Sequence, residues 1–205
     1  MSEKPHSNLE IIVFVLHALG GATQKVVTEH IAHEAFIQSP NRFSWVSSKY
    51  KGYPDKEVTR MALEDAAKSK NGALVKGKYA RDISKDGWSL TPQGILWLEE
   101  NVDRISKILS IPKNKLPTLS PTDVKRFTSR ISRERAYQKY LDHGTIEVVS
   151  RYMFTDMLQV SPDASSEILS TKFDRMYSIA RLIKDEKIIA FLSDCEYHFE
   201  DLLGS

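Results

Sequence analysis

The spacing of hydrophobic residues constrains this chain most strongly, because it follows a helical period almost throughout and changes only between residues 73 and 90. Residues 73–79 read as a strand, residues 81–87 as a polar turn, and Trp88 to Leu90 as a short return strand. One two-stranded segment among helices predicts a fold that is mainly α with a small β-hairpin.

Three helices are expected before this β-hairpin and one after it. Apolar residues spaced three and four apart place them at residues 8–19, 23–38, 54–70 and 91–109. Thr23 and Thr91 are the expected N-caps of the second and fourth helices, and Pro92 suits the first position of the fourth.

The third helix and the segment before it carry the most distinctive side chains. Its expected outward face holds Lys56, Arg60, Glu64 and Lys68, and its expected inner stripe holds Val58, Met61, Ala62 and Ala66. Residues 39–53 read as an extended loop anchored by four aromatic residues, namely Phe43, Trp45, Tyr50 and Tyr53. The three tryptophans of the chain, Trp45, Trp88 and Trp97, are expected in the core or in packing contacts, which we favour over base stacking.

A proline-containing segment divides the chain. We predict a first domain at residues 1–111, a linker at 112–120 and a helical domain at 121–205. In the last part, Leu169 to Ile183 and Ile188 to Leu202 repeat apolar residues at helical spacing, with a break in register between them. Asp185 capping a second helix of a hairpin is favoured there, and one long helix is the alternative.

Two stretches of the first domain have a familiar pattern: Trp88-Ser-Leu-Thr-Pro-Gln-Gly-Ile-Leu-Trp-Leu-Glu99, and Tyr53-Pro-Asp-Lys-Glu-Val58 followed by Ala62-Leu63. Through them, residues 8–109 resemble the winged-helix family of DNA-binding domains. The resemblance implies a winged helix followed by an α-helical domain, with the β-hairpin as the wing and the third helix presented to the major groove of duplex DNA. The loop at residues 39–53 is longer than is usual in this family.

Charge is distributed unevenly, although the net charge is only +2. Residues 42–85 hold eleven Lys and Arg against five acids, residues 125–139 hold six against one, and residues 185–205 hold one against six. The first region predicts a DNA-binding surface. Its expected contacts are Lys49, Lys51, Lys56, Thr59, Arg60, Lys68, Lys76, Lys78, Arg81 and Lys85. For residues 125–139, a second phosphate contact and an ordinary solvated helix face remain equally open.

No catalytic set emerges, so we expect a protein that is not an enzyme and binds no cofactor or metal. His30 and His33 are one helical turn apart but lack the rest of a zinc-binding motif, so a solvated face is favoured. Cys195, the single cysteine, sits in an apolar stripe and is expected to be buried. One cysteine, no long apolar run and no signal-like segment predict a cytoplasmic protein without a membrane span.

The leading hypothesis is therefore sequence-specific or structure-selective binding of double-stranded DNA, as a transcriptional regulator. The alternative is a winged-helix interaction or scaffold subunit with protein partners in a nucleic-acid-processing or defence complex. An accessory domain that directs a separate nuclease to DNA is a third reading. We also predict a homodimer through the C-terminal helices, whose interface would use Leu169, Phe173, Ile188, Leu192, Phe199 and Leu202.

Overall fold

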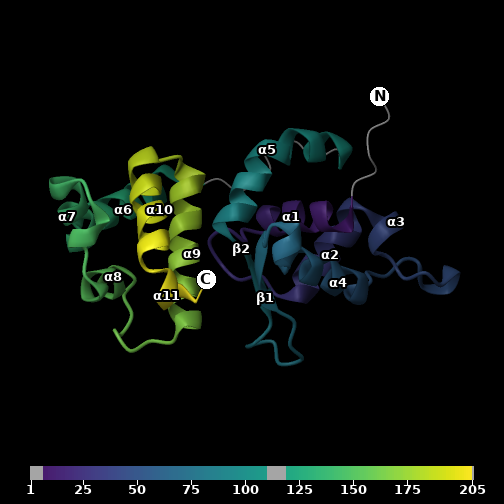
Figure 1. Cartoon of the computed structure of the whole chain (residues 1–205). Helices are drawn as coiled ribbons and strands as arrows, with labels where there is room; N and C mark the ends of the chain where they lie inside the picture. The colour runs from purple at the N-terminus through teal and green to yellow at the C-terminus, as the bar shows by residue number, and fades with distance from the viewer. Residues whose placement is uncertain (1–6, 110–118, 205) are drawn as a thin grey trace. The chain divides into compact units, whose positions relative to one another are not determined.

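The computed structural model describes residues 7–109 and 119–204 and divides the chain into two compact units, residues 1–117 and 118–205 (Figure 1). The division falls inside the predicted linker at 112–120, of which residues 112–118 lie outside the described residues. Each unit has its own hydrophobic core and is treated separately below.

The N-terminal unit is mainly helical with one two-stranded antiparallel sheet, as predicted. Its elements are α1 (Asn8–Ala18), α2 (Thr28–Gln38), α3 (Pro40–Phe43), η1 (Ser48–Tyr50), α4 (Lys56–Ala67), η2 (Ser69–Asn71), β1 (Val75–Lys78), β2 (Gly87–Leu90) and α5 (Pro92–Ile108). Residues 11–16 of α1 are all buried, and α1 contacts α2, α4, α5 and β2. A helix buried on every side therefore forms the centre of this unit.

The start of α2 differs from the prediction. We expected Thr23 to cap it, but the helix begins at Thr28, and the Thr23 hydroxyl donates instead to the Gly20 carbonyl at 3.2 Å. The intervening backbone pairs with β2, since Val26 and Trp88 exchange two N–H···O bonds of 2.9 Å each. The chain thus uses these residues to widen the small sheet, which delays the helix by a turn.

Two glycines allow the β-hairpin, residues 75–90, to form and α5 to dock against it. Gly77 lies opposite Trp88 in the register and has a φ of +152°, and a Cβ there would lie 2.2 Å from the Gly87 carbonyl oxygen. Gly94, in the first turn of α5, approaches β1 so closely that its Cβ would lie 2.0 Å from the Leu74 carbonyl oxygen. The Leu-Thr-Pro-x-Gly segment therefore brings a helix and a strand into direct backbone contact.

Residues 44–54 form a projection, here called the arm, between α3 and α4 (Figure 1). Its two sides pair at the base, where the Trp45 N–H donates to the Tyr53 carbonyl at 3.2 Å and Ser44 bridges Pro54. Of the four aromatic anchors predicted here, only Phe43 is buried, whereas Trp45, Tyr50 and Tyr53 are exposed. The prediction that these three rings are anchors is wrong, because the arm extends away from the core.

The C-terminal unit consists of helices only within its described residues, 119–204. They are α6 (Pro121–Arg133), α7 (Arg135–His143), η4 (Ile146–Val148), α8 (Arg151–Met157), α9 (Ser166–Ile183), α10 (Glu186–His198) and α11 (Glu200–Leu203). The favoured hairpin is confirmed: Lys184 adopts a left-handed φ of +56° and the Asp185 carboxylate accepts from the Ile188 N–H at 3.1 Å. The alternative of one long helix is wrong.

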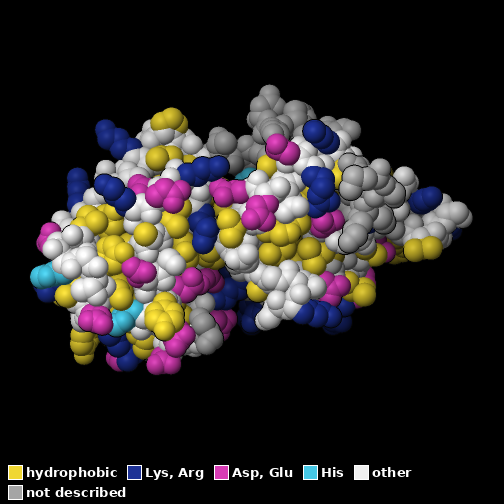
Figure 2. Space-filling view, turned by 45° about the horizontal axis from the view of Figure 1, so that its top comes forward, with side chains coloured by type: hydrophobic (Ala, Val, Ile, Leu, Met, Phe, Trp, Pro, Cys, Tyr) yellow, Lys and Arg dark blue, Asp and Glu magenta, His cyan; other side chains and the backbone are white. Residues whose placement is uncertain are grey.

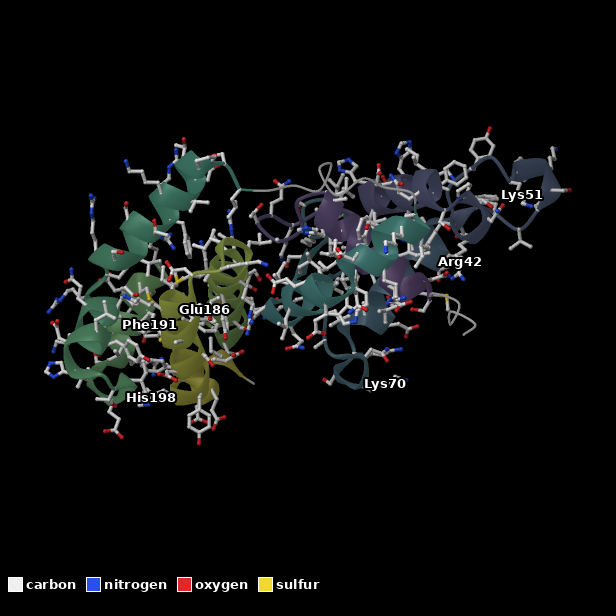
Figure 3. The ribbon with its side chains drawn as sticks, turned by 90° about the horizontal axis from the view of Figure 1, so that it is seen from above. Arg42, Lys51, Lys70, Glu186, Phe191 and His198 are labelled. Carbon is white, nitrogen blue, oxygen red and sulfur yellow. The ribbon has the colours of Figure 1, made fainter. Side chains whose placement is uncertain are left out.

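The apolar stripes of α9 and α10 form the core of this unit. Leu169, Phe173, Ile188, Leu192 and Phe199 are buried within one chain, together with Phe191 (labelled in Figure 3), and Leu202 packs against the same cluster. We predicted an interface because the stripes exceed what a two-helix hairpin can cover, but α6, α7, η4 and α8 cover the remainder. Leu169, Phe173, Ile188, Leu192 and Phe199 are therefore core residues and are not exposed for the predicted dimer interface, whereas Leu202 is partly buried.

Candidate nucleic-acid interface

The buried face of α4 is rotated relative to the prediction. Thr59, expected to face DNA, is fully buried on one face with Ala62, Leu63 and Ala66, and its hydroxyl donates to the Asp55 carbonyl at 3.1 Å. Met61, expected inside, is 56% exposed. The assignment of Thr59 as a DNA contact is wrong, because the small and branched residues of this helix share a single inner face.

The cations on the outward face of α4 are paired within the unit. Arg60 hydrogen-bonds to the carboxylates of both Glu57 and Glu64, and its bond to Glu57 holds the pKa of that carboxyl below its usual range. Lys68 pairs with Asp65 at 2.5 Å, and Lys56 pairs with Glu29 of α2 at 3.2 Å. A nucleic acid that approaches α4 therefore meets charges that already compensate one another.

The β-hairpin presents a different electrostatic surface. Lys78 and Arg81 are exposed, and neither takes part in the ion pairs found among the described residues. Lys85 lies 3.5 Å from Asp82, also exposed, and Lys76 is half-buried. Lys78, Arg81 and Lys85 therefore share one solvent-facing segment of net positive charge.

Asp86 does not oppose that charge at the surface, because its carboxylate is turned into the fold. It accepts from the Thr28 N–H and the Thr28 hydroxyl, each at 2.7 Å, and from the Ala80 N–H at 3.2 Å. The Trp88 indole N–H donates to the same Thr28 hydroxyl at 3.0 Å. This network fastens the base of the β-hairpin to the N-terminus of α2 and fixes its direction.

The arm and the β-hairpin meet α4 at the same end. The Lys56 ammonium lies 5.3 Å from the centre of the Tyr79 ring, directly after β1, while Asp55, which caps α4, ends the arm through its N–H bond to the Phe43 carbonyl at 2.6 Å. On the arm, Lys49 and Lys51 are both exposed, and Figure 3 shows Lys51 near its outer end. The base of the arm and the end of β1 thus both lie at the N-terminus of α4, and the arm carries its two lysines away from that point.

A second cationic surface lies on α6 and α7 of the C-terminal unit. Its exposed members are Lys125, Arg126, Arg130, Arg133, Arg135 and Lys139. Phe127 and Ile131 of α6 are buried, so the cations lie on the remaining, exposed part of that helix. Arg126 pairs with Asp123 at 3.6 Å, and Arg130 lies over the Phe127 ring.

Residues 7–109 and 119–204 contain no cluster of side chains placed to bind a metal ion beside these surfaces. Among the described residues no group of three or more His, Cys, Asp or Glu is placed to hold a metal, and His30 and His33 are both exposed. Cys195 is buried, as predicted, and burial raises the pKa of its thiol. Within the same residues, no helix has the length and hydropathy needed to cross a membrane.

Comparison with protein-family models, with curated proteins and with solved structures found no match to this chain.

Sequence reasoning missed two features of this interface. It gave no sign that the Asp86 carboxylate is turned into the fold, since a hydrogen-bond partner 58 residues away cannot be inferred from spacing. It also placed the aromatic rings of the arm inside the protein. The absence of any acidic residue between Glu34 and Asp55, beside three cations and several aromatic residues, is the signal from which an exposed segment could have been predicted.

Proposed function

We propose that the N-terminal unit is a winged-helix domain, that it binds double-stranded DNA, and that the chain acts as a transcriptional regulator. The order of three main helices, a β-hairpin and a closing helix supports the fold assignment. The observation that carries the binding proposal is the β-hairpin: it exposes Lys78 and Arg81 and is fixed to α2 through Asp86 and Thr28. A fixed element places its cations on phosphates at little cost in conformational entropy.

In this proposal the β-hairpin and the arm contact phosphates on either side of α4. Arg60 is the candidate for a base contact, because it is on the outward side and its planar guanidinium suits the N7 and O6 acceptors of guanine. To reach a base, Arg60 must exchange the carboxylates of Glu57 and Glu64 for that contact. This exchange favours a site whose bases can replace both carboxylates, which is a source of sequence preference.

The salt dependence of binding tests the proposal. The double variant Lys78→Ala/Arg81→Ala is compared with the parent protein in titrations of a labelled duplex over a range of salt concentrations. Each lost phosphate contact reduces the slope of log affinity against log salt by about 0.9, so the expected reduction is about 1.8. Preference among duplex sequences should be unchanged, since phosphates carry no base identity.

The matched control is Lys107→Ala/Arg175→Ala, which also removes one exposed lysine and one exposed arginine, from α5 and α9. We expect the control to keep the parental slope. A folded Lys78→Ala/Arg81→Ala protein with the parental slope would remove the β-hairpin from the interface. A parent protein that binds no duplex at low salt would refute the proposed function.

A protein-binding winged helix is the second candidate, and the surface of α4 favours it. Met61 is exposed there between Glu57, Glu64 and Asp65, a mixture of apolar and acidic groups that suits a basic protein surface better than a polyanion. A parent protein that fails to bind duplex, together with a partner whose capture is lost in Met61→Asp, would support this candidate.

A further inference from the structure

The arm carries three aromatic side chains that are exposed to solvent and do not pack against the core of the N-terminal unit. Trp45 is 48% exposed and Tyr53 61%, and Val46 beside them is 94% exposed. Figure 2 shows hydrophobic side chains at the end of the arm, at the right of the view. Large apolar side chains held away from the core of a soluble unit mark a binding surface.

The three rings are ordered before any ligand arrives. The Trp45 indole N–H donates to the Pro54 carbonyl at 3.1 Å, which fixes the rotamer of this side chain. Its ring centre lies 5.7 Å from that of Tyr50, which in turn lies 6.4 Å from that of Tyr53. The planes meet at 67° and 57°, so the rings touch at their edges and do not stack on one another. A flat ligand can therefore stack on them without first separating a stacked pair.

The charge around these rings selects the chemistry of the ligand. No acidic residue occurs between Glu34 and Asp55, whereas Arg42, Lys49 and Lys51 fall within that stretch. The Lys49 ammonium lies 5.3 Å from the centre of the Tyr50 ring, so one cation is held directly beside the aromatic group. Aromatic rings interleaved with cations, and free of carboxylates, match a ligand made of flat bases joined by phosphates.

We propose that the arm binds unpaired bases of a nucleic acid, with Trp45 and Tyr53 stacking on bases and Lys49 and Lys51 contacting the adjoining phosphates. This inference deepens the proposed function: it rests on a nucleic-acid ligand and adds selectivity for duplexes that contain a gap, flap or frayed end. Bases inside an intact duplex are stacked on their neighbours and unavailable, whereas exposed bases gain a stacking partner on the arm. The phosphates of the same strand then reach the two lysines.

Affinity for three matched DNA ligands tests the inference. They are a blunt duplex, the same duplex interrupted by a short single-stranded gap, and a free oligothymidine of the length of the gap, each measured by fluorescence anisotropy. We expect the parent protein to favour the gapped duplex over the blunt one. Trp45→Ala and Tyr53→Ala should each weaken gapped-duplex binding by about 5- to 100-fold, as expected for the loss of one base-stacking contact, and leave blunt-duplex binding unchanged.

Two further variants separate stacking from general effects. Trp45→Phe keeps a ring and should keep most of the preference for the gap. Tyr152→Ala removes a tyrosine of the C-terminal unit that is even more exposed than Tyr53, and it should change nothing. Trp45 is the most exposed tryptophan, since Trp88 is buried and Trp97 half-buried, so oligothymidine should quench tryptophan emission in the parent but not in Trp45→Phe. Tyr53→Ala keeps the test intact even if Trp45→Ala disturbs the arm.

The outcomes distinguish this inference from the proposed function. A parent protein that binds blunt and gapped duplexes equally, or variants that keep the parental preference for the gap, would overturn the role of the arm and leave duplex binding standing. Binding to the gapped duplex and to oligothymidine, without binding to the blunt duplex, would support the arm and refute the proposed duplex function. No binding to any of the three ligands would overturn both and favour a protein ligand for the aromatic rings.

Discussion

At the scale of single residues, the Thr28 hydroxyl is expected to contribute strongly to the stability of the N-terminal unit. Its hydroxyl accepts from the Trp88 indole and donates to Asp86, so one atom joins α2, β2 and the turn of the β-hairpin. Thr28→Val leaves the indole N–H buried without its partner. We expect a loss of about 1–3 kcal/mol in the free energy of unfolding, measured by urea titration with tryptophan emission.

Thr23→Val is the matched control for this prediction. Its hydroxyl is half-buried and makes one bond of 3.2 Å to the Gly20 carbonyl, so its loss should cost less than half as much. Equal losses in both variants would show that the network around Thr28 has no special weight.

His17 gives the N-terminal unit a dependence on pH. Burial lowers the pKa of this imidazole, and its Nδ1 has no hydrogen-bond partner among the described residues. Below the unfolded pKa of about 6.5, the unfolded chain binds a proton that the folded unit does not bind. The free energy of unfolding should therefore fall as the pH drops through that value toward the lower folded pKa.

Thermal unfolding of the N-terminal unit across this range of pH checks the prediction. His17→Leu should remove the part of the pH dependence due to this group, whereas His33→Leu, on the exposed face of α2, should retain it. A parental dependence in His17→Leu would assign the effect to another group.

At the scale of elements, the closeness of α5 to β1 depends on Gly94. A Cβ at this position would lie 2.0 Å from a backbone oxygen, which cannot move aside as a flexible side chain would. Gly94→Ala should therefore displace the helix from the strand and reduce stability by about 1–3 kcal/mol or more. Gly52→Ala, where a Cβ would meet nothing within 4 Å, should be close to neutral in the same urea titration.

The elements also show which features the sequence could predict. Local signals predicted three features correctly. Thr91 caps the closing helix α5, and Asp185 caps α10 in the helical hairpin. The glycines of the β-hairpin accompany its two paired strands. Long-range pairing decided the remainder. The start of α2 differs from the prediction because Val26 pairs with Trp88. The buried face of α4 was assigned wrongly because Thr59, a polar residue, lies on that face together with the alanines.

The interface was predicted unevenly for the same reason. Lys49 and Lys51 of the arm are exposed as expected, because lysine in a short projection has nowhere else to lie. Lys78, Arg81 and Lys85 of the β-hairpin are exposed as well, whereas Lys76 in β1 is half-buried. On α4, Arg60 and Lys68 find carboxylates three and four residues away, and Lys56 finds Glu29 of α2. Exposure alone therefore did not reveal that their charge is compensated. Charge counts along a sequence predict a surface but not the charges that remain unpaired on it.

At the scale of the whole molecule, the two units should respond separately to mutation. Leu192 is fully buried in the core of the C-terminal unit, so Leu192→Asp places an unpaired charge there. We expect this variant to lose about 3 kcal/mol or more and to unfold the C-terminal unit without releasing a folded monomer from a dimer. The unfolding transition of the N-terminal unit should be unchanged.

Circular dichroism with light scattering checks this outcome, with Ser193→Asp, an exposed neighbour on α10, as the control. A Leu192→Asp protein that keeps its helix content and halves its mass would instead restore the dimer interface predicted from the apolar stripes.

The burial of Cys195 makes its thiol a probe of unfolding in the C-terminal unit. A thiol reagent reaches this sulfur only in molecules whose C-terminal unit has opened. The rate of labelling therefore reports how often that unit opens. All three tryptophans lie in residues 1–117, and their emission therefore gauges the other unit alone. Opening of the C-terminal unit and unfolding of the N-terminal unit can thus be followed in the same sample of unmodified protein.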